Sequence, residues 1–365
     1  MKFTVNTKPV ISGLDLGIIT SNITKFYQKS CIVELTIEDG YLRINTEASA
    51  VKSELKFKGS VSGEGENHVF VDSLLFKNLM KTIDSDVVEF DLKEDGLTVY
   101  AGKSKFNLPQ VVSGADLELS RPQNVDEVTQ FIGVDKAGWE FIKDQQMYAI
   151  AMSFIHPVYT HAWLSDTGDV IVGDFDNSIF THSHATHLTT TCLITDTIIN
   201  LLTTVPEDSQ IIQLGKNYEI KVETDPYTYV CEFTPRYEED EGIGDYSAGI
   251  ILSLFNHESG ISLNVGVISK YISQAELFTT TNDDTIDIKM GEDSFNLINQ
   301  NVNCKIPVDN PFGEFSITFK ISLLKDAIQH MDNETISMCP LVQDDEVAGI
   351  VIWTDNMETV LAGID

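Results

Sequence analysis

Short segments in which apolar and polar residues alternate, or which are rich in β-branched residues, dominate the chain. Each is closed by Gly, Asp or Asn, which favour turns, so these segments are typical of β-strands. The clearest are Ile32–Ile37, Tyr41–Asn45, Leu55–Lys58, Val87–Leu92 and Leu97–Ala101. A smaller number of segments repeat apolar residues at i, i+3 and i+4, which predicts amphipathic helices between the strands.

One such helix is predicted from Val71 to Ile83. Its expected buried stripe consists of Val71, Leu74, Leu75, Leu79 and Ile83. Lys77 and Lys81 lie one turn apart on the other side, and Asp72 or Ser73 is suited to cap the first turn. The pattern therefore predicts a helix that buries one face and presents lysine on the opposite face.

This helical pattern occurs three times along the chain. It returns as Ile194–Val205 and Phe319–Met331, and matching Ile83 to Val205 to Met331 gives offsets of 122 and 126 residues. A second helical pattern recurs with similar spacing, at Ile18–Phe26, Ala137–Ile150 and Val265–Phe278. Repetition on this scale indicates a chain built from three similar units.

The repeat predicts an α+β protein of three tandem domains, at residues 1–121, 122–245 and 246–365, each with two helices and antiparallel sheets. Ser120–Gln123 is a polar link between the first two domains. The acidic, Gly-bearing segment Tyr237–Gly244 is the link between the second and third.

The charge of the chain is strongly negative and unevenly distributed. The 24 Lys+Arg against 56 Asp+Glu give a net charge of −32, which excludes a protein that binds nucleic acid through a basic outer surface. Residues 1–121 carry 14 basic and 17 acidic residues, whereas residues 122–365 carry 10 and 39. The first third is therefore nearly neutral, and we expect part of the chain to face a polyanion.

Cysteine usage and hydropathy predict a cytoplasmic protein. The five cysteines are far apart, include no C-x-x-C pair and are read as reduced thiols: Cys31, Cys192, Cys231, Cys304 and Cys339. No N-terminal apolar run resembles a signal peptide, and no apolar stretch reaches the ~18 residues that a membrane helix needs.

Several local motifs resemble binding sites but fail on spacing or context. Gly102-Lys103-Ser104 lacks the glycine spacing and the following helix of a phosphate-binding loop. His182 and His184 share one face of a predicted strand, which permits a metal site, but no Cys or carboxylate is recognisable at ligand spacing, so a polar strand end is favoured. Asp174–Asn177 lacks the glycine and distal Glu of a calcium loop.

A dinucleotide fingerprint is also excluded after Gly244, because Ile250–Phe255 is predicted as a strand where that motif needs a helix. No catalytic constellation, metal or cofactor is predicted.

Four segments, in order along the whole chain, resemble the bacterial DNA polymerase sliding clamp, the β subunit family of the replicase. They are Met1–Val5, residues 69–108, Gly244–Tyr246 and Val360–Ile364. Each segment alone is a weak signal, and the ordered set together with the threefold repeat carries the resemblance. The family's Thr-Asp-Gly-His-Arg stretch is here Asp174–Ser178, and its Met-Pro-Met-Arg end is missing. These departures fit a phage-encoded or divergent member.

The resemblance implies a non-catalytic, head-to-tail homodimeric ring that encircles duplex DNA, is opened by a clamp loader and tethers the replicative polymerase as a processivity factor. The helices would line the hole. Eight lysines on polar faces of the helical segments are the expected phosphate contacts, independent of DNA sequence: Lys25, Lys29, Lys77, Lys81, Lys136, Lys143, Lys270 and Lys325.

The resemblance also implies two protein interfaces. Phe106 and Leu108 of one chain would pack near Leu277 and Phe278 of the other. Partner peptides would dock between the second and third domains, in a pocket lined by Tyr159, Phe175, Ile179, Tyr246, Leu323, Val360 and Ile364.

Two other classes of function stay open at this point, and so does the number of chains in a ring. One class is an acidic, repetitive phage structural or receptor-binding β protein with no role on DNA. The other is a carboxylate-based hydrolase, which would need converging Asp and Glu side chains with raised pKa values rather than lysine-lined helices.

Overall fold

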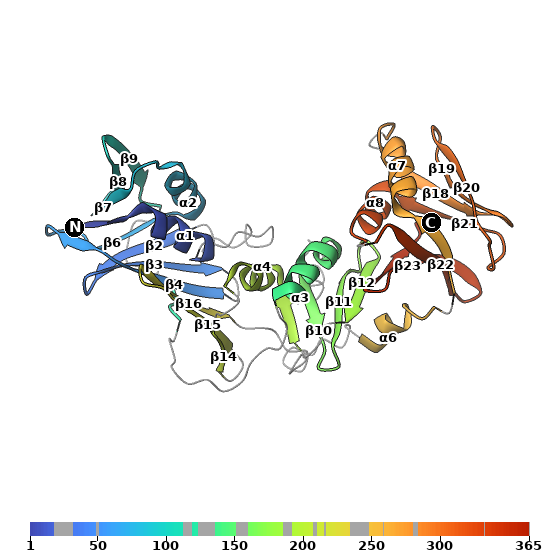
Figure 1. Cartoon of the computed structure of the whole chain (residues 1–365), viewed down its shortest axis with the longest axis horizontal. Coiled ribbons are helices and arrows are strands. Elements are labelled where there is room, and N and C mark those ends of the chain that lie inside the picture. Colours follow the sequence, from blue (N-terminus) through green and yellow to red (C-terminus); the bar gives the residue numbers. More distant parts are fainter. Residues whose placement is uncertain are drawn as a thin grey trace. The chain divides into compact units, whose positions relative to one another are not determined.

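The computed structural model describes residues 1–17, 32–48, 51–111, 119–122, 136–150, 160–184, 192–206, 210–214, 217–233, 248–257, 259–279, 284–331 and 333–364, drawn as ribbon in Figure 1. The chain forms two compact units. Unit 1 contains Met1–Lys136 and Thr195–Arg236, and unit 2 contains Ala137–Ile194 and Tyr237–Asp365.

Unit 1 holds two antiparallel sheets. The five-stranded sheet has the order β5 (Ser60–Ser62), β1 (Lys2–Asn6), β7 (Val87–Lys93), β8 (Gly96–Ala101) and β9 (Ser104–Pro109). The seven-stranded sheet has the order β14 (Gln210–Leu214), β15 (Asn217–Glu223), β16 (Tyr227–Phe233), β4 (Val51–Lys58), β3 (Tyr41–Ala48), β2 (Ile32–Glu38) and β6 (His68–Asp72). Its helices are α1 (Thr7–Gly17), α2 (Ser73–Thr82) and α4 (Asp196–Thr204).

Unit 2 is built in the same way. Its eight-stranded sheet has the order β13 (Cys192–Thr195), β10 (His161–Leu164), β11 (Asp169–Asp174), β12 (Ile179–His184), β24 (Met357–Ala362), β23 (Glu346–Trp353), β22 (Thr335–Gln343) and β17 (Ile261–Asn264). Its four-stranded sheet has the order β20 (Asn303–Pro307), β19 (Ser294–Ile298), β18 (Thr285–Met290) and β21 (Phe315–Lys320). Its helices are α3 (Lys136–Phe141), which begins at the unit boundary, α6 (Ala248–Ser253), α7 (Val265–Glu276) and α8 (Ile321–Gln329).

Both large sheets combine strands from different predicted repeats. In unit 1, β16 pairs with β4, so that Tyr229 lies opposite Leu55. In unit 2, β12 pairs with β24, so that His182 lies opposite Glu358. Each sheet therefore continues from one repeat into another, and the compact units cut across the repeat. The boundaries at 1–121, 122–245 and 246–365 stay a prediction.

Helix α1 packs closely on β4 because it carries glycine where it meets that strand. A Cβ atom on Gly17 would clash with the Leu55 side chain, and one on Gly13 would lie 2.8 Å from Cζ of Phe57. The carbonyl of Gly17, at the end of the helix, accepts a 2.7 Å hydrogen bond from the Thr46 hydroxyl. The close approach therefore also satisfies a carbonyl that the helix itself leaves without a partner.

Helix α2 buries a different face from the one predicted. Its buried side chains are Ser73, Phe76 and Met80, and the Phe76 ring lies 6.0 Å from that of Phe90 on β7. Leu74 and Leu75, placed in the predicted buried stripe, are each 52% exposed. Val71 and Ile83, at the ends of the predicted stripe, are buried as expected. For Leu74 and Leu75 the prediction was wrong, because α2 carries two apolar stripes and the sheet packs against the one with the large aromatic ring.

The other predicted helical segments agree with the structure to different degrees. Residues 194–205, 265–278 and 319–331 contain α4, α7 and α8 as predicted. Ala137–Ile150 is helical but changes from α3 into a π-helical turn and then a 3-10 turn. The predicted helix Ile18–Phe26 lies outside the described residues, and α1 precedes it.

The predicted strand Ile250–Phe255 is a correction, since it overlaps helix α6. Ile251 and Phe255 are four residues apart and both join one apolar cluster on the eight-stranded sheet. An apolar run of this length fits the period of a strand as well as that of a helix. The segment is helical because Ile251 and Phe255 can then both pack into the cluster.

Two further expectations concern the thiols and the membrane. Cys231, Cys304 and Cys339 are buried and form no disulfide, and burial raises the pKa of Cys339 to about 11. Cys31 lies outside the described residues. Among the described helices, none is long and apolar enough to span a bilayer.

Candidate nucleic-acid interface

The candidate interface is a set of helices whose charges differ more than their lysine content suggests. Together α1 and α2 carry Lys8, Lys77 and Lys81 against Asp15, a balance of three to one that leaves +2. In α7 and α8, Lys270 and Lys325 are matched by Glu276 and Asp326, which leaves zero. Of these two described helix pairs, only α1–α2 presents an excess of positive charge.

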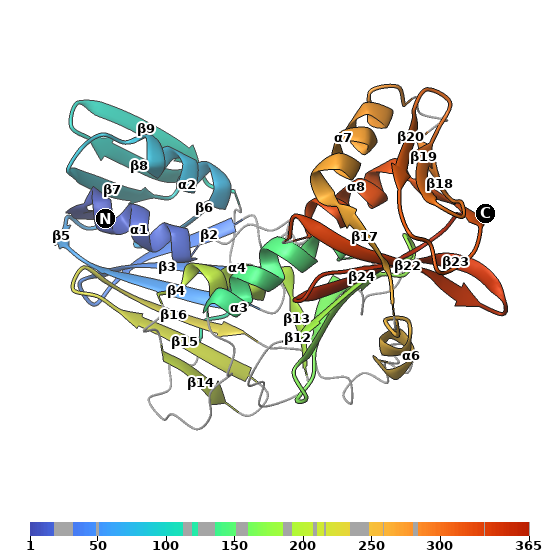
Figure 2. The same ribbon diagram turned by 45° about the vertical axis from the view of Figure 1, so that its right-hand side comes forward.

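Within unit 1, α1 and α2 lie side by side and share one carboxylate (Figure 1 and Figure 2). Oδ1 of Asp15 lies 2.8 Å from Nζ of Lys81 and 3.6 Å from Nζ of Lys77. The Lys77 side chain is only 14% exposed, and burial lowers the pKa of Lys77, partly offset by Asp15. The half-exposed Lys81 is therefore the more accessible cation of the two.

Within unit 2, α7 and α8 also lie side by side but pair their charges one to one. Nζ of Lys325 lies 2.9 and 2.7 Å from the two carboxylate oxygens of Glu276. Lys270, on the exposed side of α7, makes no ion pair with any described residue. The only unmatched cation of this helix pair is therefore Lys270, and Asp326 balances it in net charge.

The remaining predicted phosphate contacts are weaker. Lys136 and Lys143 lie in the α3 segment, where Glu140 and Asp144 cancel their charge. Helix α4 carries no lysine. Lys25 and Lys29 lie outside the described residues. Among the predicted lysines that the structure describes, an excess of lysine over carboxylate is therefore found only on α1 and α2.

The described residues of the predicted peptide pocket differ in exposure, and several lie near one end of β12 and β24. Phe175, in the turn between β11 and β12, is 58% exposed, and Ile364 is 38% exposed. Backbone hydrogen bonds tie this region together, from the amide of Ala362 to Ser178 and from the amide of Ile364 to Thr318, each 2.9 Å. Leu323 lies in the first turn of α8, which directly follows β21.

Two pocket residues lie on opposite faces of their sheet. Ile179 pairs with Leu361 and Phe180 with Val360, so side-chain alternation turns Ile179 and Val360 to different sides. Both are 2% exposed. Tyr159 and Tyr246 lie outside the described residues. The pocket as a whole stays a prediction.

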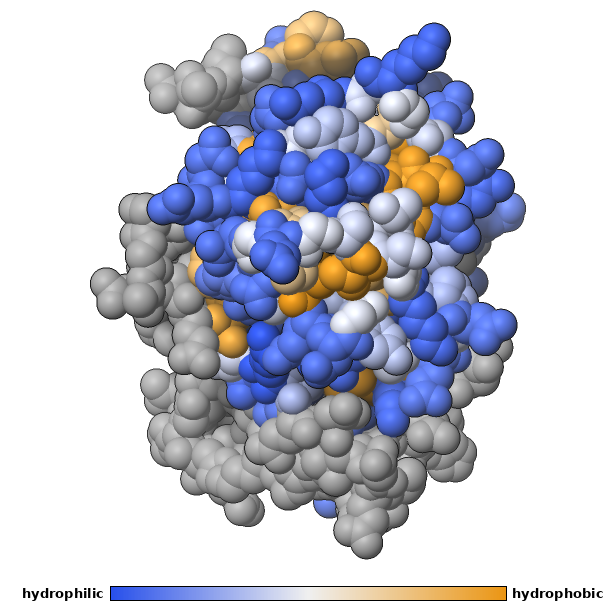
Figure 3. Space-filling view, turned by 90° about the vertical axis from the view of Figure 1, so that its left-hand side faces the viewer, coloured by the Kyte–Doolittle hydropathy of each residue, from blue (hydrophilic) through white to orange (hydrophobic). Residues whose placement is uncertain are grey.

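The predicted subunit contacts are also divided by burial. Leu277 and Phe278 follow the last turn of α7 and are 80% and 55% exposed. Phe106 on β9 is half-buried, whereas Leu108 is 3% exposed and belongs to the core of unit 1. Figure 3, which views the molecule from the side of unit 1, shows separate apolar patches in a mostly hydrophilic surface.

A polar cluster in unit 2 was only half visible in the sequence. His182 and His184 were recognised as neighbours, but Asp169, 13 residues before His182, was not. The register of the β11–β12 hairpin sets Asp169 opposite His184, and only a predicted register could have revealed it. Burial lowers the pKa of His182, but its hydrogen bonds to Glu358 and Asp169 outweigh burial and raise that pKa.

Comparison with known proteins shows which solved structures share this architecture. No protein-family model and no curated protein matches the chain. Solved structures do, over 100% of the chain. The DNA polymerase III β subunit from Thermotoga maritima matches with a TM-score of 0.74, 13% identity and 99% of its own length covered.

Two further structures agree with this match. The polymerase III β subunit of Caulobacter crescentus has a TM-score of 0.74 at 12% identity, with all of both chains covered. The DNA polymerase sliding clamp from Bacillus subtilis has a TM-score of 0.70 at 14% identity, covering 100% of this chain and 99% of its own. At these identities the likeness speaks for architecture, and it extends from end to end. The chain therefore has the fold of the bacterial DNA polymerase III β sliding clamps.

Proposed function

We propose that this chain is a non-catalytic sliding clamp, which encircles duplex DNA and tethers a replicative polymerase as a processivity factor. The observation that carries the proposal is the full-length match to β clamps, with all of this chain and 99% of the Thermotoga maritima chain covered. A structural phage protein or a hydrolase has no reason to share that architecture over its whole length.

Electrostatics supports the same role. An acidic protein repels DNA over most of its surface, and a local excess of lysine then decides where a duplex is tolerated. Among the described helices, the positive excess lies on α1 and α2. Lysine ammonium groups contact phosphates without reading bases, so the binding is independent of sequence and permits sliding. Retention would come from the closed ring, not from affinity.

The ring would be a head-to-tail homodimer. Strand β9 is an edge of the five-stranded sheet and β20 is an edge of the four-stranded sheet, as far as the described strands show. Free edges are normally covered or paired. At each of the two interfaces, β9 of one chain would pair with β20 of the other, and Leu277 and Phe278 would pack against Phe106. Both sheet edges of each chain would then be covered, and the ring would be closed.

Partner peptides would dock at the end of β12 and β24 in unit 2, with Phe175, Leu323 and Ile364 as the proposed accessible contacts. Exposed apolar side chains at this site suit a short peptide with apolar anchors. The buried Ile179 and Val360 face opposite sides of the sheet, so at most one of them would line the site directly. A clamp loader belongs to the same proposal because a closed ring has to be opened, and a role in replication implies a cytoplasmic location.

Native mass and electron microscopy test the ring directly. We expect the wild-type chain to run at twice its 40.6 kDa mass and to show closed rings in negative stain. The double variant Leu277→Asp with Phe278→Asp should be monomeric, because each apolar side chain loses about 1.5–3 kcal/mol of burial in two interfaces.

Ile250→Asp is the matched control, since Ile250 is an equally exposed apolar residue, at 67%, on α6 and outside the proposed contact. A wild-type chain that is monomeric, or a dimer that survives the double substitution, would refute the proposed ring contact.

A further inference from the structure

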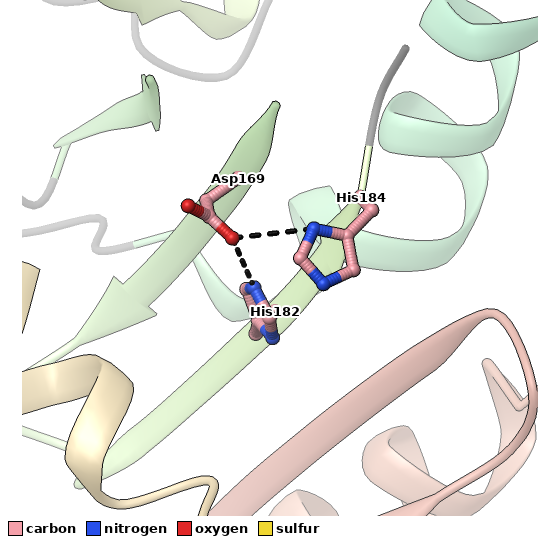
Figure 4. Close-up of side chains that lie close together, drawn as sticks. All are labelled: Asp169, His182 and His184. Atoms are coloured by element: carbon pink, nitrogen blue, oxygen red, sulfur yellow. Dashed lines mark hydrogen bonds and ion pairs between the residues drawn. The ribbon is translucent and has the colours of Figure 1, made fainter. Parts of the chain in front are cut away.

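Three potential metal ligands converge where two inner strands of the eight-stranded sheet of unit 2, β11 and β12, begin and end respectively. Figure 4 shows Asp169 at the start of β11 facing His182 and His184 on β12. Oδ1 of Asp169 lies 3.1 Å from Nε2 of His182 and 3.2 Å from Nδ1 of His184. All three ligand atoms lie within 4.8 Å of one another. Strand pairing produces this arrangement, because His182 and His184 share a face and Asp169 lies opposite His184.

The surrounding side chains hold two of the three groups in place. Nδ1 of His182 bonds Oε2 of Glu358 on β24 at 3.0 Å, which leaves Nε2 directed at Asp169. The other oxygen of Asp169, Oδ2, accepts a 2.8 Å hydrogen bond from the Thr167 hydroxyl. In metalloproteins, a ligating histidine is commonly oriented by a carboxylate bonded to its other ring nitrogen, and a ligating carboxylate by a hydrogen-bond donor. His182 and Asp169 have these outer partners.

Support extends one residue further. Oε1 of Glu358 lies 3.0 Å from Nε2 of His257, and the His257 ring stacks on Trp353 with centroids 3.8 Å apart. Glu358 is thereby fixed between two imidazoles. The outer partners of the cluster thus come from β23, β24, the β10–β11 turn and the segment after α6, all within unit 2.

Exposure differs among the three groups in a way that suits a binding site. The side chains of His182 and Asp169 are 9% and 16% exposed, whereas that of His184 is 73% exposed. Two ligands are therefore prepositioned by their outer partners, whereas the exposed His184 contacts Asp169 and the ring of His182. An ion held there would keep at least one coordination position open to solvent.

We propose that Asp169, His182 and His184 form a binding site for a divalent transition-metal ion, best matched by Zn²⁺. Zinc bonds imidazole nitrogen and carboxylate oxygen at about 2.0–2.2 Å, so tetrahedral ligands lie roughly 3.3–3.5 Å apart. The separations of 3.1 and 3.2 Å from Asp169 to the two histidines are close to that spacing. Two nitrogens and one oxygen exclude Ca²⁺ and Mg²⁺, which prefer all-oxygen sites.

The bound ion would join β11 to β12 and, through Glu358, reinforce the β12–β24 pairing. That pairing is where strands from the second and third predicted repeats meet. The inference is independent of the proposed function, because it concerns one sheet of one chain.

Untagged wild-type protein should bind one equivalent of Zn²⁺ in competition with a chromogenic chelator. Co²⁺ in its place should give the visible absorption of a tetrahedral N,O site. His184→Gln removes the exposed ligand with little effect on folding and should weaken Zn²⁺ binding at least about tenfold. Asp169→Asn should weaken it similarly. His68→Gln in unit 1, which also removes a histidine bonded to a carboxylate, should leave Zn²⁺ binding unchanged.

A wild-type chain that does not compete for Zn²⁺, or a His184→Gln variant that binds as tightly as wild type, would overturn the site. In both cases the cluster is only a set of hydrogen bonds. Thermal unfolding gives a second readout. Excess Zn²⁺ should raise the Tm of wild type relative to EDTA and should not raise that of His184→Gln. An equal rise in both proteins would place the ion elsewhere and contradict the proposal.

Discussion

The helix pairs α1–α2 and α7–α8 belong to the first and third repeats. Both form ion pairs between a lysine and a carboxylate, but in different ratios. In each, a lysine on one helix reaches a carboxylate on its neighbour, at 2.8 Å for Lys81 and Asp15 and at 2.7 Å for Lys325 and Glu276. In α1–α2, however, two lysines share one carboxylate, whereas in α7–α8 the match is one to one. Counting lysines therefore overstates the similarity of the two regions.

The difference matters because exposed ion pairs are weak, about 0–1 kcal/mol each. A phosphate can take the place of Asp15 at little cost, and α1–α2 retains a positive excess even while Asp15 is bound. For α7–α8, Glu276 and Asp326 balance both lysines, so no excess of positive charge remains to attract a phosphate. We infer that unit 1 carries most of the attraction for DNA and that unit 2 contributes mainly Lys270.

Charge reversal in the two helix pairs gives the largest expected effect. Lys77→Glu with Lys81→Glu should strongly reduce affinity for a short duplex and lower the slope of log K against log salt by about 0.9 for each lost phosphate contact. Lys270→Glu with Lys325→Glu changes the net charge equally and should cost less. Fluorescence anisotropy across a salt series measures both, and equal losses would break the comparison.

An intermediate effect is expected from the packing that positions Asp15. Gly17→Val forces a side chain against Leu55 and should lower the free energy of unfolding by about 1–3 kcal/mol. Gly249→Ala is the control, because a Cβ at Gly249 meets nothing within 4 Å, and it should be neutral or stabilising by about 0.5–1 kcal/mol. Urea denaturation distinguishes them. Unchanged stability of Gly17→Val would show that α1 does not need its close approach to β4.

The smallest effect should come from removing the shared carboxylate. Asp15→Asn frees two lysines and should raise duplex affinity by no more than about fivefold, the equivalent of one surface ion pair. Glu276→Gln frees only Lys325 and should raise affinity less. If Glu276→Gln has the larger effect in the same anisotropy assay, the positive excess does not lie where the helix charges place it.

How much the sequence predicted depended on the distance between interacting residues. The strands and the helices α4, α7 and α8 follow from local periodicity, and the resemblance to clamps anticipated the fold. Helix α2 carries two apolar stripes, and packing determines which one is buried. The apolar run of α6 fits a strand as well as a helix, and packing determines that it is helical. The continuation of each large sheet across repeats could not be read locally, because β4 and β16 are far apart in the chain.

The candidate sites follow the same rule. Lys77 and Lys81 were recognised on their helix, but Asp15, which binds both, lies more than 60 residues away. His182 and His184 were recognised by strand alternation, whereas Asp169 needed the hairpin register and Glu358 needed the pairing of β12 with β24. Local spacing thus identifies single elements, and tertiary pairing determines the charge that each element presents.

Topological retention on DNA tests the central claim most directly. Chains dissociated by dilution are mixed with nicked circular duplex, concentrated to close the ring, and separated from free protein by gel filtration. A protein that encircles DNA should co-elute with the circle and be released when a restriction enzyme linearises it. Protein that stays bound to the linear form, or that associates equally with circular and linear DNA throughout, would contradict the account.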